Sequence, residues 1–154
     1  MPKWTDAQKN AIDARDCNVL VSAAAGSGKT AVLVERVIKL LTDSSAPIDA
    51  DKLLIVTFTN AAAAEMKNRI MSSLNALIAE NPNDTNAIRQ LSLLPSAKIC
   101  TIDSFCINLV RENFFNIDIQ QDFRVLDDSE EQIIEQTAID TVVEQLYEES
   151  REEF

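Results

Sequence analysis

The strongest constraint on the fold is a short apolar run that leads directly into a glycine-containing turn and then into a helix. Residues 19–30 read Val-Leu-Val-Ser-Ala-Ala-Ala-Gly-Ser-Gly-Lys-Thr. Because Gly26 and Gly28 lack a Cβ atom, the backbone can pass close to phosphate oxygens, and the N–H groups that open the next helix face the anion. Lys29 offers a positive charge for the β- and γ-phosphates, and the Thr30 hydroxyl offers a ligand for Mg²⁺. The pattern therefore predicts binding of a nucleoside triphosphate.

One position departs from the generic phosphate-binding loop. Ala23 occupies the first position, where that pattern has glycine, but Gly26 lies inside the loop and keeps the turn possible. The alternative is a simple turn before a helix with an exposed lysine. The apolar run before the turn and the apolar periodicity after it favour the phosphate loop. The predicted nucleotide-binding residues are Ala23, Ala24, Ala25, Gly26, Ser27, Gly28, Lys29 and Thr30, with Lys29 and Thr30 also catalytic and Thr30 the metal ligand.

The alternation of strands and helices predicts an α/β fold. We expect strands over residues 18–24, 52–58 and 97–102, of which the first is a continuous apolar run typical of a central parallel strand. We expect helices over residues 6–14, 29–41, 60–80 and 104–115, and a short helix that ends near residue 94. Thr5 is placed to cap the first of these helices. Such alternation indicates a parallel sheet with right-handed crossovers.

The last part of the chain is strongly acidic. Of the 25 Asp and Glu residues behind the net charge of −11, residues 127–154 carry 11, with Arg151 as the basic residue there. The rest is nearly neutral, which leaves room for a local nucleic-acid contact surface. We expect a helix that begins near Asp127, with Asp127 or Ser129 as its N-cap and its charges on a solvated face. The helical pattern reaches the last residue without a terminating signal, so we expect a fragment of a longer protein.

Composition excludes several kinds of chemistry. The sequence has no His, which rules out catalysis and metal binding by that residue. Cys17, Cys100 and Cys106 are odd in number and lack a metal-binding spacing, so we expect reduced thiols and a cytoplasmic protein. No apolar run is long enough to span a membrane, and the N-terminus does not resemble a signal peptide.

A loop that hydrolyses a nucleotide also needs an acidic residue at the end of another strand. Asp103 follows the third predicted strand and is a candidate for binding Mg²⁺, although capping of the next helix is the preferred interpretation. Asp127 and Asp128 follow a weaker apolar run that Arg124 interrupts, and helix capping is preferred there too.

Polar and aromatic residues follow the second and third predicted strands. These segments read Thr57-Phe-Thr-Asn60 and Thr101-Ile-Asp-Ser-Phe105. An aromatic ring flanked by hydroxyl groups can stack on a nucleic-acid base while its neighbours contact phosphates. The alternative is a core Phe at each strand end, with Thr59 or Asn60 as a helix cap. The residues alone leave both interpretations open.

Taken in order, these segments resemble the UvrD/Rep-type superfamily 1 DNA helicases, and among them most closely the AddA-type branch. The motifs are Trp4-Thr-Asp-Ala-Gln8, the loop of residues 23–30, Val56-Thr-Phe-Thr-Asn60 followed by Ala64-Glu-Met66, Thr101-Ile-Asp-Ser-Phe-Cys106 and Asp122-Phe-Arg-Val-Leu-Asp127. Five motifs in register cover nearly the whole chain, so the resemblance is highly specific for the superfamily.

The resemblance implies a RecA-like P-loop NTPase fold. Residues 1–106 would form the ATP-binding region of a partial domain 1A, and residues 107–154 the start of a helical 1B subdomain. The implied cofactors are ATP and Mg²⁺, with Gln8 reading the adenine edge, and Ala23 becomes the usual residue at its position. Single-stranded DNA contacts are implied for Thr57, Phe58, Thr59, Asn60, Thr101, Ser104 and Phe105. Many relatives have His where this chain has Asp103, an acid that would repel DNA phosphate.

The resemblance also implies a parent that is an ATP-dependent 3'-5' DNA helicase/nuclease subunit in double-strand break repair and recombination. Its partners would be single- and double-stranded DNA and a second subunit, without a membrane. Motif II, an arginine finger and a second RecA-like domain are not in this sequence, so we expect the fragment to bind ATP but to hydrolyse it poorly or not at all. Two alternatives are a self-contained P-loop kinase or nucleotidase that uses Asp103, and a non-catalytic module whose acidic helix binds a basic partner.

Overall fold

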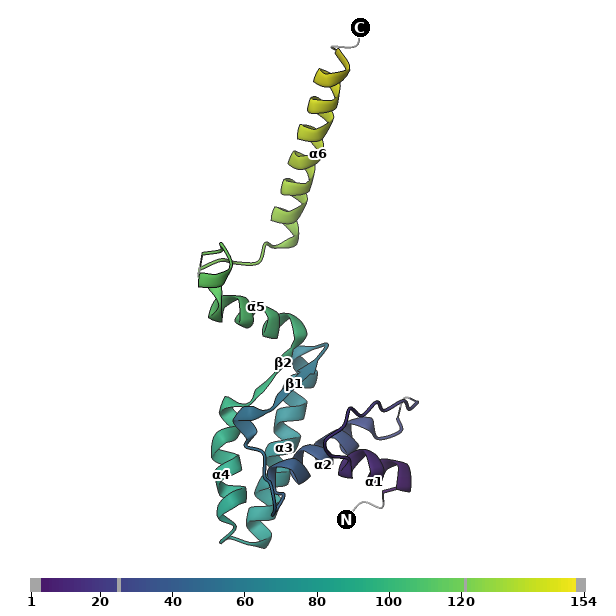
Figure 1. The fold of residues 1–154 in the computed structure, drawn as a ribbon, viewed down its shortest axis with the longest axis vertical. Helices are drawn as coiled ribbons and strands as arrows, with labels where there is room; N and C mark the ends of the chain where they lie inside the picture. Colours follow the sequence, from purple (N-terminus) through teal and green to yellow (C-terminus); the bar gives the residue numbers. More distant parts are fainter. Residues whose placement is uncertain (1–3, 25, 121, 152–154) are drawn as a thin grey trace. The chain divides into compact units, whose positions relative to one another are not determined.

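A computed structural model of the chain describes residues 4–24, 26–120 and 122–151. The elements follow in the order α1 (Asp6–Asp13), α2 (Lys29–Leu41), η1 (Ala50–Lys52), β1 (Leu54–Thr57), α3 (Asn60–Glu80), α4 (Thr85–Leu93), η2 (Leu94–Ser96), β2 (Lys98–Thr101), α5 (Ile102–Glu112), η3 (Phe114–Asn116) and α6 (Asp128–Arg151), as Figure 1 shows by colour. The chain divides into two compact units between Leu109 and Val110. The division into subdomains at residues 106 and 107 stays a prediction.

The first helix confirms the capping expected from the sequence. The Thr5 hydroxyl accepts a hydrogen bond from the Gln8 backbone N–H at 3.3 Å, and the Gln8 side-chain Oε1 accepts one from the Thr5 N–H at 2.9 Å. This reciprocal pair satisfies two N–H groups that a helix start otherwise leaves without partners. Helix α1 therefore begins at Asp6 as predicted.

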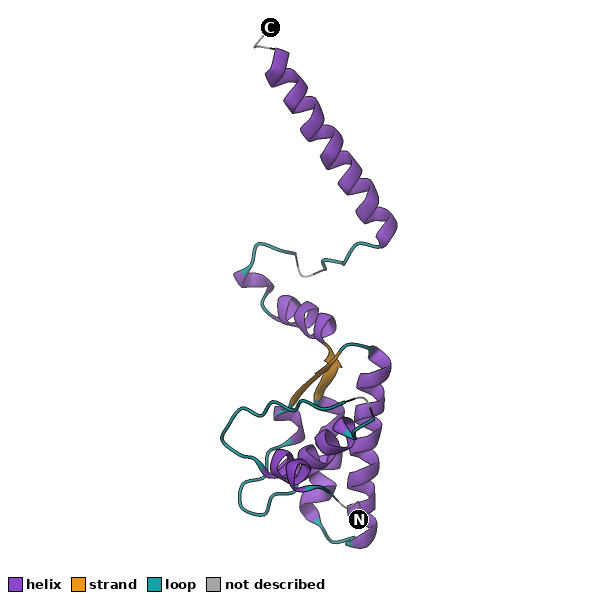
Figure 2. Cartoon of the chain, turned by 90° about the vertical axis from the view of Figure 1, so that its right-hand side faces the viewer, coloured by secondary structure: helices purple, strands orange, loops and turns teal. Residues whose placement is uncertain are grey.

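The strands of the described residues form a parallel pair. Strand β1 lies beside β2, and Figure 2 shows the two strands in orange. In the register of the pair, Leu54 lies opposite Lys98 and Thr57 opposite Thr101. Helices α3 and α4 connect the two strands, and α3 packs against both of them. The α/β class and the parallel pairing are thus confirmed, with both strands shorter than predicted.

The strand predicted over residues 18–24 is not formed. This segment is irregular, and its apolar side chains lie in solvent, with Leu20 96% exposed and Val19 and Val21 exposed as well. A strand requires a neighbour that completes its ladder of backbone hydrogen bonds. In the described part of the chain β1 and β2 pair with each other, so the segment finds no such neighbour, and its apolar character alone does not create a strand.

The core lies where α2 and α3 meet the strands. The buried side chains come from α2 (Val34, Val37, Ile38, Leu41), from α3 (Met66, Ile70, Leu74), and from Ala50, Ile55, Leu94 and Ala97. Full burial of an aliphatic side chain stabilises the fold by about 1.5–3 kcal/mol. Met66, Ile70 and Leu74 form one apolar stripe on the buried face of α3. Packing of this stripe on α2 fixes the helix that follows the glycine turn.

Helix α5 begins earlier than predicted, and its cap is a different residue. It starts at Ile102, and the Thr101 hydroxyl accepts a hydrogen bond from the Ser104 backbone N–H at 3.1 Å. Asp103 lies within the first turn of α5 and does not precede the helix, so the proposal that it is the N-cap is wrong. Thr101 serves as the cap because its hydroxyl is one residue before the helix and within reach of the third N–H.

The acidic C-terminal helix begins as expected. The Asp127 carboxylate accepts hydrogen bonds from the backbone N–H groups of Ser129 and Glu130, both at 3.0 Å, which makes Asp127 the N-cap. Helix α6 then runs from Asp128, and the side chains of Ile133, Ile134, Val142 and Leu146 are exposed. The capping interpretation of Asp127 is thus confirmed.

Candidate nucleotide-binding site

The glycine turn adopts a conformation that other residues rarely take. Gly26 and Gly28 have φ angles of 78° and 81°, in the left-handed region. A Cβ atom at Gly26 would meet no atom within 4 Å, and one at Gly28 would lie 3.7 Å from Gln8 Nε2. Backbone strain, and not lack of space, is therefore what requires glycine at both positions. Ala25, predicted to bind nucleotide, lies outside the described residues.

Helix α2 starts immediately after this turn. Gly28 is its N-cap and has no side chain that could accept a hydrogen bond from the first backbone N–H groups of the helix. Lys29 and Thr30 occupy the first turn and are exposed. Backbone N–H groups at such a start have no acceptor within the helix, and the helix dipole places partial positive charge there. The turn thus leads into a helix end that favours an anion.

The ammonium group of Lys29 folds back over the turn. Its Nζ donates to the carbonyl oxygen of Ala23 at 2.7 Å and to that of Ala24 at 2.8 Å. Ser27 closes the turn from the other side, because its N–H donates to the Ala24 carbonyl at 3.3 Å. The structure therefore brings Ala23, Ala24, Ser27 and Lys29 together around one loop, and their role in nucleotide binding stays a prediction.

Gln8 connects α1 to the same loop. Its Nε2 donates to the Ser27 carbonyl at 3.3 Å, while its Oε1 accepts from the Thr5 N–H. A glutamine amide has two N–H donors and two acceptor lone pairs, so these bonds leave one N–H and one lone pair available. A pocket of about 330 Å³ lies here and is lined by Gln8, Ser27 and Lys29 together with α1 and α2 residues.

A second, larger pocket has a different lining. It has a volume of about 710 Å³ and is lined by residues of α2 and α3 and by Trp4, and it includes none of the predicted site residues. Its size alone does not make it the site, because chemistry at a site depends on the polar groups that converge there.

The residues after β1 form a turn with an exposed aromatic ring. Phe58 is 97% exposed, so the alternative in which it is a core side chain is wrong. The Thr59 hydroxyl caps α3 by accepting from the Ala62 N–H at 3.1 Å, and the Thr57 hydroxyl donates to the Thr59 carbonyl at 2.9 Å. Asn60 is the first residue of α3 and not its cap. The helix-capping interpretation of Thr59 is thus confirmed, and Phe58 is left facing solvent.

The residues after β2 lie beside that turn. Register pairs Thr57 with Thr101, so both segments leave the same end of the parallel strands. Thr101 is buried and donates to the Ser104 hydroxyl at 2.8 Å, and Phe105 is half-buried. Asp103 is exposed and does not line the pocket beside Lys29. The structure thus brings together the two candidate DNA-contacting segments, but the glycine turn does not share their sheet edge, because residues 18–24 do not join the sheet.

One contact near the site was not predicted from the sequence. Arg36 of α2 donates from Nη1 to the carbonyl oxygens of Ala11 at 2.7 Å and Ala14 at 2.6 Å. These partners are 25 and 22 residues apart along the chain. No local pattern signals such a pairing, because an arginine on a helix surface usually faces solvent.

Within the described residues, no helix has the length and apolar character needed to cross a membrane.

Comparison with known proteins identifies the family to which the chain belongs. A family model described as the UvrD/REP helicase N-terminal domain matches residues 4–154. The chain is 52% identical over 145 residues to the A subunit of the ATP-dependent helicase/nuclease from Thermoanaerobacter sp. (strain X514), covering 94% of this chain and 12% of that protein.

Two further relatives carry the same name. The chain is 51% identical over 153 residues to the protein from Clostridioides difficile (strain 630) and 49% identical over 152 residues to that from Clostridium botulinum (strain Alaska E43 / Type E3). Each match covers 99% of this chain and 12% of the relative, so the chain spans about one eighth of their length. These findings confirm the resemblance, and the chain belongs to the UvrD/REP helicase N-terminal domain family.

Proposed function

We propose that this chain is the ATP-binding part of a RecA-like domain 1A, with α6 in the start of subdomain 1B, from an ATP-dependent DNA helicase/nuclease. The observation that carries the proposal is the glycine turn, in which Gly26 and Gly28 are left-handed before an uncapped start of α2. Backbone N–H groups, the helix dipole and the Lys29 ammonium all favour a polyphosphate at this position.

The N–H group and the lone pair of the Gln8 amide that have no partner among the described residues support adenine as the base of the nucleotide. Adenine presents an N–H donor and a ring-nitrogen acceptor side by side, and a glutamine amide pairs with both at once. The Gln8 amide keeps one N–H and one lone pair beyond its bonds to Ser27 and Thr5. We therefore assign Gln8 to the adenine edge and residues 23–30 to the phosphates.

The metal would be Mg²⁺ held mainly by the nucleotide. The described residues contain no group of three or more Cys, Asp or Glu side chains that could bind a metal ion. The exposed Thr30 hydroxyl, in the first turn of α2, is a suitable hard oxygen ligand, and Mg²⁺ commonly combines one or two protein oxygens with phosphate oxygens and water. When bound, the ion would neutralise phosphate charge.

Single-stranded DNA is the proposed second ligand. The Phe58 ring is available for stacking, and the hydroxyls of Thr57, Thr59 and Ser104 lie at the same end of the two described strands. The buried Thr101 would act through its hydrogen bonds to Ser104. Asn60 and Phe105 would complete the contact surface. Asp103 is exposed at this end and would repel phosphate, so the DNA backbone would pass on the other side of α5's first turn.

The activity proposed for the parent protein follows from the name of its relatives. The A subunit of an ATP-dependent helicase/nuclease implies at least one partner subunit. We propose a cytoplasmic 3'-5' helicase that acts in double-strand break repair and recombination. Because this chain spans 12% of such relatives and lacks an acidic motif II, we expect it to bind ATP without efficient hydrolysis.

The proposal is tested by titrating the chain with MgATP in a calorimeter and by following its thermal unfolding. Lys29→Met should weaken binding at least tenfold, because it removes the charge that meets the phosphates. Lys67→Met is the matched control, since Lys67 is half-buried and its ammonium, like that of Lys29, donates to a backbone carbonyl, that of Pro95. Saturation at 100 times Kd should stabilise the wild type by about 2.7 kcal/mol. Equal binding by wild type and Lys29→Met would refute the assignment of the loop.

A further inference from the structure

Helix α1 is attached to α2 and its preceding loop at both of its ends. At its start, Gln8 Nε2 donates to the Ser27 carbonyl at 3.3 Å. At its end, Arg36 Nη1 donates to the carbonyls of Ala11 and Ala14 at 2.7 and 2.6 Å, with that of Ile12 at 3.4 Å. The two helices therefore run side by side in the same direction.

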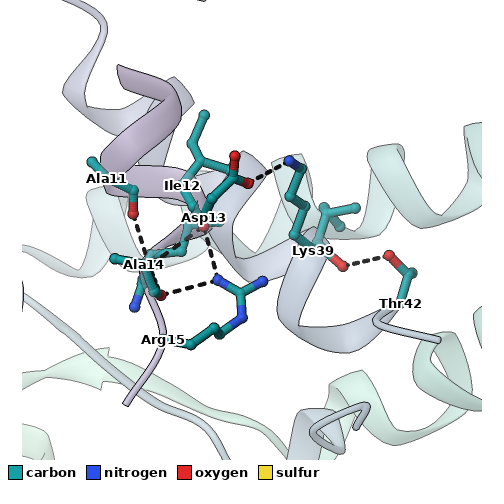
Figure 3. Close-up of polar contacts among 9 residues, drawn as sticks. Ala11, Ile12, Asp13, Ala14, Arg15, Lys39 and Thr42 are labelled. Atoms are coloured by element: carbon teal, nitrogen blue, oxygen red, sulfur yellow. Dashed lines mark hydrogen bonds and ion pairs between the residues drawn. The ribbon is translucent and has the colours of Figure 1, made fainter. Parts of the chain in front are cut away.

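The C-terminal end of α1 is stabilised by positive charge from residues outside the helix. The last carbonyls of a helix lack intrahelical partners and carry partial negative charge. Helix α1 has no basic residue in its own last turn. Arg15, just beyond the helix, folds back to donate to the Ile12 and Ala14 carbonyls, both at 3.0 Å, and Lys39 of α2 pairs with the Asp13 carboxylate (Figure 3). Arg36 is the residue of α2 that binds the backbone itself.

Such attachment decides where Gln8 points. An isolated helix shorter than about 12 residues is marginal in water, so the orientation of the eight-residue α1 depends on its contacts. The Gln8–Ser27 bond is long and exposed, and it cannot fix the helix axis alone. Ile12, one turn after Gln8, is 1% exposed, which places the Gln8 side of α1 against the rest of the unit.

Arg36 is well placed to control this orientation from a distance. It follows Lys29 by seven residues, which is two helical turns, or about 10.5 Å along α2. It therefore lies on the same side of α2 as Lys29 but too far along the helix to reach phosphates held at the loop. Any effect of Arg36 on the nucleotide must pass through α1.

We propose that Arg36 is a positioning residue that sets the preference for adenine over guanine nucleotides. By holding the carbonyl end of α1 on α2, it keeps the Gln8 amide above the loop at the place where a base would lie. Guanine presents two acceptors where adenine presents a donor and an acceptor, so the free lone pair of Gln8 favours adenine only while the amide is held in place. This inference rests on the proposed function, because it concerns the same pocket.

The test compares MgATP, MgGTP and magnesium tripolyphosphate binding by calorimetry in wild type, Arg36→Met and Gln8→Ala. Arg36→Met keeps the aliphatic stem and removes the donors. We expect the ratio of ATP to GTP affinity to fall about five- to tenfold, as expected from loss of one bidentate amide contact. Tripolyphosphate has no base, so its affinity should change less than about twofold, well under the roughly tenfold effect of a lost charge contact.

Three further variants separate positioning from a general loss of structure. Arg36→Lys keeps the charge and donors and should retain most of the ATP preference. Lys39→Met removes a charge from the same end of α1 but leaves the carbonyl contacts, so its ATP-to-GTP ratio should match wild type. In the Gln8→Ala background, Arg36→Met should not lower the ratio further. If circular dichroism shows that Arg36→Met does not fold, Arg36→Gln, too short to reach the carbonyls, replaces it.

The results distinguish this inference from the proposed function. If wild type bound neither MgATP nor tripolyphosphate, both the proposed function and the role of Arg36 would be refuted. If wild type bound both, but Arg36→Met left the ratio unchanged, the role of Arg36 would be refuted while the ATP site stood. Equal weakening of all three ligands, or an additive effect in the Gln8→Ala background, would also refute it, since either shows an action outside Gln8.

Discussion

Among single residues, Phe58 combines an aromatic ring with almost complete exposure. Its ring is 97% exposed at the end of β1, between two threonines whose hydroxyls are engaged in local hydrogen bonds. Leaving a Phe side chain in water forgoes about 1.5–3 kcal/mol of burial. The turn around it is ordered by Thr59 and by the start of α3, so the ring is presented from a fixed backbone.

Phe58→Ala should therefore weaken binding of single-stranded DNA without loss of stability. Removal of one stacking contact is expected to cost about 1–3 kcal/mol of binding free energy. Fluorescence anisotropy with a labelled oligothymidine at fixed salt measures the effect. Phe115→Ala is the matched control, because Phe115 is 87% exposed and lies in the other unit of the chain. A larger effect at Phe115 than at Phe58 would contradict the assignment.

Asp13 allows a prediction about pH. Its hydrogen bond with the Lys39 ammonium lowers the pKa of this carboxyl below its ordinary value. Because the folded-state pKa is lowered, the pair contributes to stability above the ordinary carboxyl pKa, and the contribution is lost as pH falls through the lowered pKa. Carbon-13 NMR titration should find the Asp13 midpoint below that of an unpaired Asp, and Lys39→Met should raise it. An unchanged midpoint in that variant would show that Lys39 is not the cause.

At the scale of elements, the sequence predicts those features that depend on residues close together in the chain, such as helix caps and helix ends. The Thr5 cap of α1, the start of α2 at Lys29 and both ends of α3 match expectation, because caps and apolar periodicity act over three or four residues. The glycine loop and its lysine were predicted for the same reason. The contact of Arg36 with α1 and the register of β1 against β2 could not be predicted, since the partners are distant in the sequence.

The packing of α3 on α2 gives the clearest element-scale prediction. Leu74 is completely buried in the core between these helices. Leu74→Ala should reduce the free energy of unfolding by about 2–5 kcal/mol, through lost burial and the cavity left behind. Met71, on the same helix and 41% exposed, is the control, and Met71→Ala should change stability by less than about 1 kcal/mol. Urea unfolding followed by circular dichroism measures both, and equal effects would place the core elsewhere.

At the scale of the whole molecule, the described residues have a two-stranded sheet. Residues 18–24 carry the apolar character of a central strand but are irregular and exposed, whereas β1 and β2 pair with each other. The apolar pattern of residues 18–24 is that of a strand, but the described residues contain no strand with which this segment pairs. The chain spans about one eighth of the length of the relatives that it matches.

Hydrogen exchange can test directly whether residues 18–24 are irregular. The backbone amides of residues 19–24 should exchange rapidly in this chain, because no ladder protects them, while those of β1 and β2 should exchange slowly. In the longer protein proposed above, the same amides should become protected by strand pairing. Strong protection of residues 19–24 in the present chain would contradict the irregular structure found for this segment.

The folded-back Lys29 changes how affinity at the loop should be understood. Its ammonium already donates hydrogen bonds to the carbonyl oxygens of Ala23 and Ala24. A phosphate bound at the proposed site would therefore replace these carbonyl oxygens as the acceptors. Only the difference between the two sets of acceptors contributes to affinity, and monovalent anions such as chloride should compete weakly. Discrimination for multiply charged ligands would then begin before any base is recognised.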